Sequence, residues 1–411
     1  MAAPTLVSFT CLEQLHPSAS DAETTQSRLL FALCLGIFVT QLDARVIAPV
    51  LPGIANDLRL TLPQSAMLLT AYFLPYGFFQ LVYGPLAGRF GKMRLVVAAM
   101  TVFSLATLFG SAWPSFSIML FLRFLAGAAA ACIYPMSVAY VGDTISYEKR
   151  QAALGLLISS SGTAVAFSLS LGGLIASLLS WHWIFPLLGL IALASTGLLA
   201  LQIKNEIKLP KISLRESMYA YKKALSAPLV MPLLLLAALE GAIYLGSFSL
   251  WSEPLSRWHG LPSHWIGLIL CMAGVLQLGT GYALRRYKGK LNEKQLVKAG
   301  GTCMSLAFLL LVLIDHWAVF IFSSALIGFA FVTCHTTLQI KATEVYAGNR
   351  STTYGMFTLS LFLGSGIGSA VVGYLVTKLE FRPSMFILFL AAIAFSVLTL
   401  QYLKIFSREK A

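Results

Sequence analysis

Twelve long apolar segments, separated by short polar connections, constrain the fold of this chain more than any other feature of its sequence. Each segment is about 20 residues long, the length that an α-helix needs to cross the hydrocarbon core of a bilayer. Six lie on either side of a basic stretch at residues 204–227. They cover residues 29–50, 63–87, 93–112, 115–141, 150–179 and 183–203, and then 228–250, 262–284, 296–314, 316–340, 351–377 and 383–404.

The composition also indicates a membrane protein. Of the 411 residues, 58% are hydrophobic and only 11% are charged, whereas a soluble domain carries about 25% charged residues. We therefore predict an all-α polytopic membrane protein with twelve transmembrane helices. Two six-helix bundles are expected at residues 28–203 and 228–404, joined by a basic cytoplasmic linker at 204–227. Residues 1–27, which lack the basic start of a signal peptide, and residues 405–411 are expected to be cytoplasmic tails.

The distribution of positive charge predicts the orientation. With the N-terminus inside, 23 of the 29 lysines and arginines fall in cytoplasmic segments. Cytoplasmic loops of membrane proteins are enriched in these residues, so we expect both termini to be cytoplasmic in a bacterial inner (plasma) membrane. The formal net charge of +13 then reflects orientation in the lipid bilayer and does not indicate nucleic-acid binding. We expect a monomer.

Short patterns recur in both halves of the chain, which indicates an internal duplication. Asp43 and Glu240 are 197 residues apart, and the same offset relates residues 84–89 to residues 281–286. Two parallel halves related by an axis along the membrane normal form one of the known transporter architectures, so the two bundles are expected to be pseudo-symmetric. A second repeat, offset by 200 residues, relates Arg150, Gly155, Ser160 and Gly173 to Arg350, Gly355, Ser360 and Gly373.

A basic, glycine-rich turn lies between the second and third apolar segments, and its residues are Gly84, Arg89, Gly91, Lys92 and Arg94. The turn resembles the loop signature of the major facilitator superfamily. This resemblance implies that these residues take part in the conformational change of a transporter. The signature has an acid where this chain has glycine, at position 88, so the acid-based latch of the family is missing or rebuilt here.

Two further segments extend the resemblance along nearly the whole chain. The Leu122–Gly127 segment is similar to the family's fourth-span signature around a buried arginine, Arg123. Arg150, followed by a small-residue span that ends in Gly172 and Gly173, is similar to the twelve-span drug:proton antiporter branch, although the Gly-Pro of that motif is absent. The resemblance implies a conformational role for Arg150 and the two glycines.

Four ionisable residues lie inside apolar segments, where a charge is costly and usually faces a cavity or a partner. They are Asp43, Arg45, Arg123 and Glu240. Asp43 and Arg45 point to different sides of one helix, so each is expected to have its own partner. Asp43 and Glu240 can carry protons; alternatively, a carboxylate forms a permanent ion pair with Arg45 or Arg123. Arg123 can serve as a charge partner or contact a substrate anion. Arg45 can extend its long side chain outward toward the membrane surface.

Polar and aromatic side chains are expected to line a substrate cavity or, alternatively, to hydrogen-bond between helices. An aromatic cavity with few charges suits an amphipathic or weakly cationic organic molecule. His335 is a candidate proton relay, but a lone histidine in an apolar helix is more often paired with a neighbour. The candidate substrate-binding residues are Tyr72, Tyr76 and Gln80, four residues apart in the second segment, with Tyr244, Gln277 and Gln339 in the second half.

These features predict a secondary active transporter that works by alternating access. We expect it to export a small amphipathic organic molecule or drug in exchange for protons; the alternative is a proton symporter that imports a nutrient or metabolite. The sequence contains no nucleotide-binding GxxxxGK[ST] loop and no cluster of residues at catalytic or metal-ligand spacing. We therefore expect neither an enzyme nor a cofactor or metal, and the proton gradient is the expected energy source.

Overall fold

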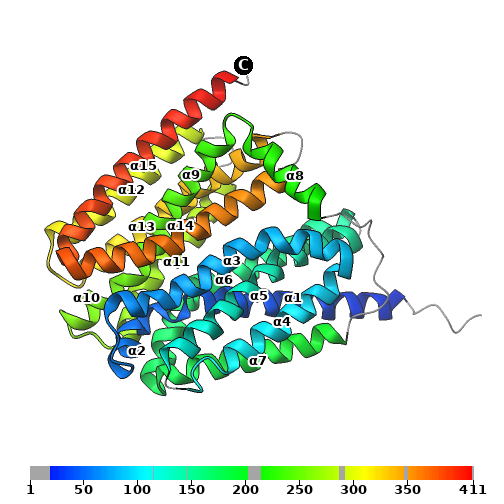
Figure 1. The fold of residues 1–411 in the computed structure, drawn as a ribbon, viewed down its shortest axis with the longest axis horizontal. Coiled ribbons are helices and arrows are strands. Elements are labelled where there is room, and N and C mark those ends of the chain that lie inside the picture. Colours follow the sequence, from blue (N-terminus) through cyan, green and yellow to red (C-terminus); the bar gives the residue numbers. More distant parts are fainter. Residues whose placement is uncertain are drawn as a thin grey trace, which may run out of the picture.

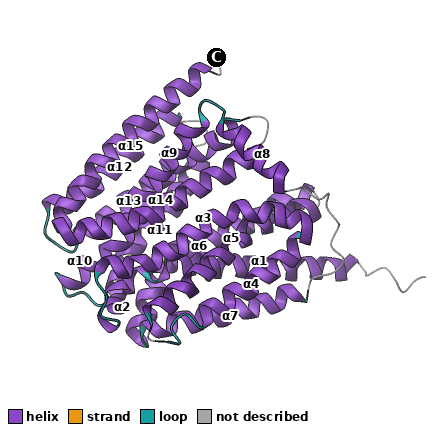
Figure 2. Cartoon of the chain, viewed as in Figure 1, coloured by secondary structure: helices purple, strands orange, loops and turns teal. Residues whose placement is uncertain are grey.

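The computed structural model describes residues 19–113, 115–145, 147–201, 214–286, 292–346 and 350–409. Within these ranges the chain is almost entirely helical (Figure 2). Residues 1–18 of the predicted N-terminal tail and residues 204–213 of the predicted linker lie outside the described residues. Helix α1 begins at Ala19, inside the predicted tail, and the last helix extends past residue 404 to Glu409.

The N-terminal bundle forms the lower half of the molecule in Figure 1. Thr61 and Gln64 form a capping box at the start of its second long helix, and Gly91, with a φ of 91°, ends that helix. A residue with a side chain would be strained at this φ. The elements are α1 (Ala19–Val46), η2 (Ala48–Val50), α2 (Leu51–Asp57), α3 (Leu62–Phe90), α4 (Lys92–Leu108), α5 (Phe116–Thr144), α6 (Tyr147–Leu178), η3 (Trp181–Trp183) and α7 (Ile184–Ala200).

The C-terminal bundle forms the upper half of the view, and a short helix, α8 (Leu214–Leu225), lies at the side between the two bundles (Figure 1). The first span of this bundle is interrupted by a π-helical turn, η4. The elements are α9 (Val230–Gly241), η4 (Ala242–Gly246), η5 (Ser249–Trp251), α10 (Ser252–Arg257), α11 (Ser263–Arg286), α12 (Glu293–Leu313), α13 (Val319–Glu344), α14 (Arg350–Leu379) and α15 (Phe381–Glu409).

The prediction of a twelve-helix membrane protein is confirmed. Within the described ranges, eleven helical segments are long and apolar enough to cross a membrane. The twelfth predicted span corresponds to α4, which has 17 residues, and about 17 residues is the shortest length that spans a bilayer. Helices are the expected result, because backbone polar groups in lipid must be satisfied within the segment.

Small residues hold the two bundles together. Helices α3 and α14 lie side by side across the interface, as do α6 and α11 (Figure 1). A Cβ added to Gly274 on α11 would overlap the backbone of Ala166 on α6. Lipid provides no hydrophobic driving force between helices, so association depends on this kind of close backbone packing. The α3–α14 contact adds a hydrogen bond of 2.8 Å from the Thr70 hydroxyl to the Gly366 carbonyl.

The two ends of the interface are built differently. At one end the short helices α2 and α10 contact each other, so that the bundles touch there. The opposite end carries the basic turn around Gly91 and helix α8, and the bundles spread apart toward it (Figure 1). The Tyr221 hydroxyl of α8 donates a hydrogen bond of 3.2 Å to the Leu81 carbonyl of α3. This bond fastens the connecting helix to the N-terminal bundle.

Candidate transport site between the bundles

Asp43 and Arg123 form a buried ion pair inside the N-terminal bundle. The Arg123 Nη1 and Asp43 Oδ2 atoms are 2.8 Å apart, and the exposed fractions of the two side chains are 2% and 0%. The guanidinium also lies 4.3 Å above the ring centroid of Tyr72, and the Tyr72 hydroxyl donates to the Thr40 carbonyl. Of the two partners considered for Asp43, the structure selects Arg123.

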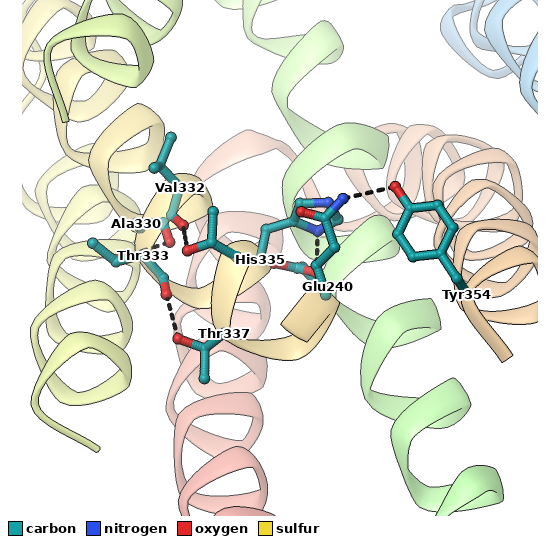
Figure 3. A network of polar contacts seen from close by, with 9 residues as sticks. Glu240, Ala330, Val332, Thr333, His335, Thr337 and Tyr354 are labelled. Atoms are coloured by element: carbon teal, nitrogen blue, oxygen red, sulfur yellow. Dashed lines mark hydrogen bonds and ion pairs between the residues drawn. The ribbon is translucent and has the colours of Figure 1, made fainter. Parts of the chain in front are cut away.

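Glu240 and His335 form the corresponding contact in the C-terminal bundle (Figure 3). The His335 Nδ1 and Glu240 Oε2 atoms are 3.0 Å apart. Glu240 is fully buried, whereas 16% of the His335 side chain is exposed. The imidazole stacks on Phe331 with a ring-centroid distance of 4.6 Å. The second carboxylate oxygen, Oε1, is buried and has no hydrogen-bond partner among the described residues, as is also the case for Oδ1 of Asp43.

Glycines fix the position of Glu240. A Cβ on Gly241 would overlap the Leu361 carbonyl of α14, and one on Gly364 would overlap the Ala238 carbonyl of α9. The two backbones therefore cross in direct contact beside the carboxylate. The π-helical turn η4 follows immediately and rotates the rest of this span relative to Glu240. Turns of this kind occur frequently at functional sites in α-helices.

Arg45 faces a small cavity at the interface of the two bundles. The cavity has a volume of about 20 Å³, which is space for about one water molecule. Among the described residues no carboxylate lies within ion-pair distance of the Arg45 guanidinium. Its titratable neighbours are the phenols of Tyr244, which lines the same cavity, and of Tyr76 and Tyr72. Both bundles contribute to the wall, which includes Phe73, Val165, Leu169, Tyr244, Phe248, Ser249 and Gln277.

Five of the six candidate substrate-binding residues fall into three separate polar groups, and the sixth, Tyr72, packs against Arg123. Tyr76 accepts a hydrogen bond of 3.2 Å from Gln41, and Gln80 lies within reach of the same phenol. Gln277 donates to the Tyr244 hydroxyl. The third group is apart from the Arg45 cavity: the Gln339 amide donates a hydrogen bond of 2.7 Å to Tyr354, which lies near His335 and Glu240 (Figure 3). Of the six candidates, Tyr244 and Gln277 line the Arg45 cavity, whereas Tyr72, Tyr76, Gln80 and Gln339 are not among its lining residues.

The two glycines of the fifth span pack in different directions. A Cβ on Gly172 would overlap the Val46 carbonyl of α1, in the same bundle, whereas a Cβ on Gly173 would overlap the Ser263 carbonyl of α11, in the other bundle. Arg150 donates from its guanidinium to the Ile145 carbonyl at 3.2 Å and 3.3 Å. Adjacent glycines therefore join one helix to both halves of the molecule.

The basic turn makes its one described ion pair through Lys92. Lys92 contacts Asp143 at the end of α5, whereas Arg89 and Arg94 are exposed. Gly84 has open space where a Cβ would be placed, so packing within the structure does not require a glycine there. The turn thus connects the start of α4 to the end of α5 within one bundle.

The C-terminal bundle carries a related ion pair with reversed charges. Lys341, near the end of α13, lies 2.7 Å from Glu293 at the start of α12 and 3.1 Å from Glu344. Its ammonium also lies 4.7 Å from the ring centroid of Phe406 on α15. In the N-terminal bundle the lysine is on the third span and the acid on the fourth, whereas here the acid is on the third span and the lysine on the fourth.

Some residues of the site were not singled out from the sequence. Phe362 on α14 stacks on Phe73 at 5.8 Å and meets the edge of Tyr76 at 4.5 Å, so it carries the aromatic contact between the bundles. Tyr354 and Phe331 also belong to this group. Apolar spans contain many aromatic residues, and no local pattern distinguishes these three.

Two helical bundles with buried polar groups at and beside their interface are an architecture known among membrane transporters. The family model described as "Major Facilitator Superfamily" matches residues 33–368. The chain belongs to the Major Facilitator Superfamily, whose members are transporters and not enzymes and need no cofactor. It is a multi-pass membrane protein.

Comparisons with individual proteins agree with this family. The chain is 26% identical over 387 residues to the "Uncharacterized MFS-type transporter YdgK" of Bacillus subtilis (strain 168), covering 90% of this chain and 94% of YdgK. It is 30% identical over 157 residues to the "MFS thioclapurine efflux transporter tcpA" of Claviceps purpurea (strain 20.1), covering 38% of this chain and 29% of tcpA. The solved structure of the nucleoside transporter NupG has a TM-score of 0.73 at 13% identity, covering 91% of this chain and 99% of NupG.

The similarity to efflux proteins is confined to part of their length. The efflux transporter tcpA and the efflux pump hmp6 of Hypomyces subiculosus are matched over 29% and 28% of their own length. Their names therefore support a proposal about export and do not establish it. The similarity to NupG establishes the fold alone.

Proposed function

We propose that this protein is a proton-coupled exporter of a small amphipathic organic molecule, which works by alternating access of the two bundles. The observation that carries the proposal is the buried contact between Glu240 and His335. Similarity to proteins named as efflux transporters supports the direction. We further propose that the protein is a monomer in a bacterial inner membrane with both termini in the cytoplasm.

The two buried carboxylates differ in how readily they can exchange a proton. Asp43 is paired with an arginine, which stays charged at all physiological pH values. Protonation of Asp43 would leave a buried guanidinium without a counter-charge, which is costly. Glu240 is paired with a histidine, the side chain whose charge changes between about pH 5 and pH 8. The Glu240–His335 pair is therefore our proposed proton carrier, and Asp43–Arg123 stabilises the N-terminal bundle.

The exposed fractions of the two side chains suggest a route for the proton. His335 is the partly exposed member and Glu240 the fully buried one, so a proton reaches the carboxylate through the imidazole. Uptake of one proton by His335 creates an imidazolium next to a carboxylate. Transfer of that proton from Nδ1 to Oε2 leaves a neutral imidazole and a carboxylic acid. Loss of the proton on the other side of the membrane restores the starting pair.

Close packing between the bundles supports a rocking movement. The α6–α11 contact consists of bare backbone at Gly173, Gly267 and Gly274, and few side chains must separate when the bundles move apart. We propose that the basic turn and Arg150 stabilise the cytoplasmic end, through the Lys92–Asp143 pair and the Ile145 carbonyl.

The direction of transport is tested by comparing intracellular metabolites in cells with and without the gene. An exporter predicts accumulation of its substrate in cells that lack the gene, whereas lower levels would favour the proton-coupled importer. The compound that accumulates is then loaded into proteoliposomes that contain the purified protein. Flux that follows an imposed pH gradient and disappears when the gradient is dissipated is the expected result. Flux that is indifferent to the gradient would contradict proton coupling.

A further inference from the structure

We infer that the transported molecule is an organic anion with an aromatic or other apolar body, and that its anionic group binds Arg45. The inference rests on the proposed transport function and names the class of substrate. It differs from the weakly cationic molecule that the aromatic residues alone suggest, because the charges around the cavity favour the opposite sign.

Arg45 carries the uncompensated charge of the interface. The Arg123 guanidinium is neutralised by Asp43 at 2.8 Å, and Glu240 lies 3.0 Å from His335. In the described part of the chain no acid remains within ion-pair distance of Arg45. Its titratable neighbours are phenols, which are neutral at physiological pH. A cation held inside a membrane bundle without a counter-ion is costly, and a substrate anion would remove that cost.

The position of Arg45 is that of a substrate contact. Its side chain borders a cavity whose wall comes from both bundles, with Phe73 and Leu169 from one and Tyr244 and Gln277 from the other. A molecule bound there touches both moving parts, as alternating access requires. Arg123, by contrast, is buried within its own bundle, and its two terminal nitrogens, Nη1 and Nη2, donate hydrogen bonds to Asp43.

The side chains that line the cavity indicate the chemistry of the rest of the transported molecule. Phe73, Phe248 and Tyr244 provide apolar and aromatic surface, and Gln277 and Ser249 provide neutral polar groups. A guanidinium binds a carboxylate through two parallel hydrogen bonds. One carboxylate or sulfonate on an apolar ring system matches this set. A dianion would leave its second charge against an apolar wall.

The small size of the cavity has a consequence for binding. A volume of about 20 Å³ is far below the roughly 300–1,000 Å³ of pockets that hold organic ligands. The substrate therefore requires the bundles to separate, which breaks the backbone contact between Gly274 on α11 and Ala166 on α6. Neutralisation of Arg45 by the substrate would then compensate for the lost packing.

The experiment measures equilibrium binding to the full chain in lipid nanodiscs by dialysis. The probes are naphthoate, the neutral naphthamide and the cation naphthylmethylammonium, which share one ring system. The wild type is expected to bind naphthoate about tenfold or more tightly than the amide, as for a charged hydrogen-bonded contact. Arg45→Gln should lose this preference and Arg45→Lys should keep part of it. Arg257→Gln, a change at an exposed arginine on α10, is the matched control.

A second measurement uses the wild-type protein and therefore does not depend on whether the Arg45 variants fold. Phenylglyoxal modifies accessible arginines, and its attachment to Arg45 is followed by peptide mass spectrometry. Naphthoate should protect Arg45 and naphthamide should not. The inference is overturned if naphthoate does not bind the wild type, if the ammonium probe binds more tightly, or if Arg45→Gln keeps the anion preference. The binding and protection measurements use no pH gradient, so their results do not change if transport is not coupled to protons. Conversely, if the protein does not prefer the anion, the metabolite comparison can still show export.

Discussion

Asp43 and Glu240 are the buried carboxylates on the first spans of the two bundles, and each contacts the fourth span of its own bundle. Asp43 on α1 meets Arg123 on α5 at 2.8 Å, and Glu240 on α9 meets His335 on α13 at 3.0 Å. The same geometric arrangement therefore holds a permanently charged partner in one half and a titratable partner in the other. Duplicated halves can in this way divide structural stabilisation and proton exchange between them.

Glu240→Gln is expected to abolish flux driven by a pH gradient and to leave exchange of substrate across the membrane intact. The amide keeps the shape of the side chain but cannot take up and release a proton. The measurement is flux in proteoliposomes with and without a pH gradient. Glu253→Gln, at an acid paired with Arg257 on α10, is the control and should behave like the wild type. Gradient-driven flux in Glu240→Gln at the wild-type rate would exclude Glu240 as the carrier.

His335→Gln is expected to flatten the pH dependence of transport. Histidine is the side-chain type that can change its charge between about pH 5 and pH 8, whereas glutamine cannot take up a proton. Wild-type flux at a fixed gradient should change across this range, while the variant should show a slower and nearly constant rate. A variant that keeps the wild-type pH profile would show that His335 only positions Glu240.

Asp43→Asn is expected to destabilise the N-terminal bundle by about 3–5 kcal/mol, because it leaves the buried Arg123 charge without a partner. The double variant Asp43→Leu with Arg123→Met removes both charges and should cost less than the sum of the two single changes. Thermal unfolding of the purified protein measures both effects. Additive losses would show that the two side chains do not stabilise each other.

Reversing the charges of the Lys341–Glu293 pair tests whether it stabilises the end of the C-terminal bundle. Lys341→Glu alone places like charges near Glu293 and Glu344, and should lower the melting temperature and the transport rate. Adding Glu293→Lys to this variant should restore part of both losses. If the double variant is as impaired as Lys341→Glu alone, the losses come from the missing contact between Lys341 and Phe406.

Gly173→Val is expected to favour the state in which α6 and α11 are apart. A side chain at this position would overlap the backbone of Ser263, so the closed contact becomes unfavourable. Labelling of a cysteine introduced in the cavity wall reports the change in accessibility. Gly197→Val, at a position with open space around its Cβ site, is the matched control. Equal labelling of both variants would show that the α6–α11 contact does not control access.

The sequence alone determined the helical architecture. Lipid leaves backbone polar groups no partner except each other, so a run of apolar residues of sufficient length specifies a helix without reference to its neighbours. Asp43, Arg45, Arg123 and Glu240 stand out for a related reason, since any charge in such a run is conspicuous.

The tertiary structure decided which of these charges meet. Asp43 and Arg45 are two residues apart, yet one is paired with Arg123 and the other borders the cavity. Glu240 meets His335 across 95 residues of sequence, next to a π-helical turn that no local pattern indicates. Partner choice depends on how far each helix is rotated about its axis when it packs. That rotation is set by contacts from other helices, such as Gly172 against Val46 and Gly241 against Leu361, and not by the residues of the helix itself.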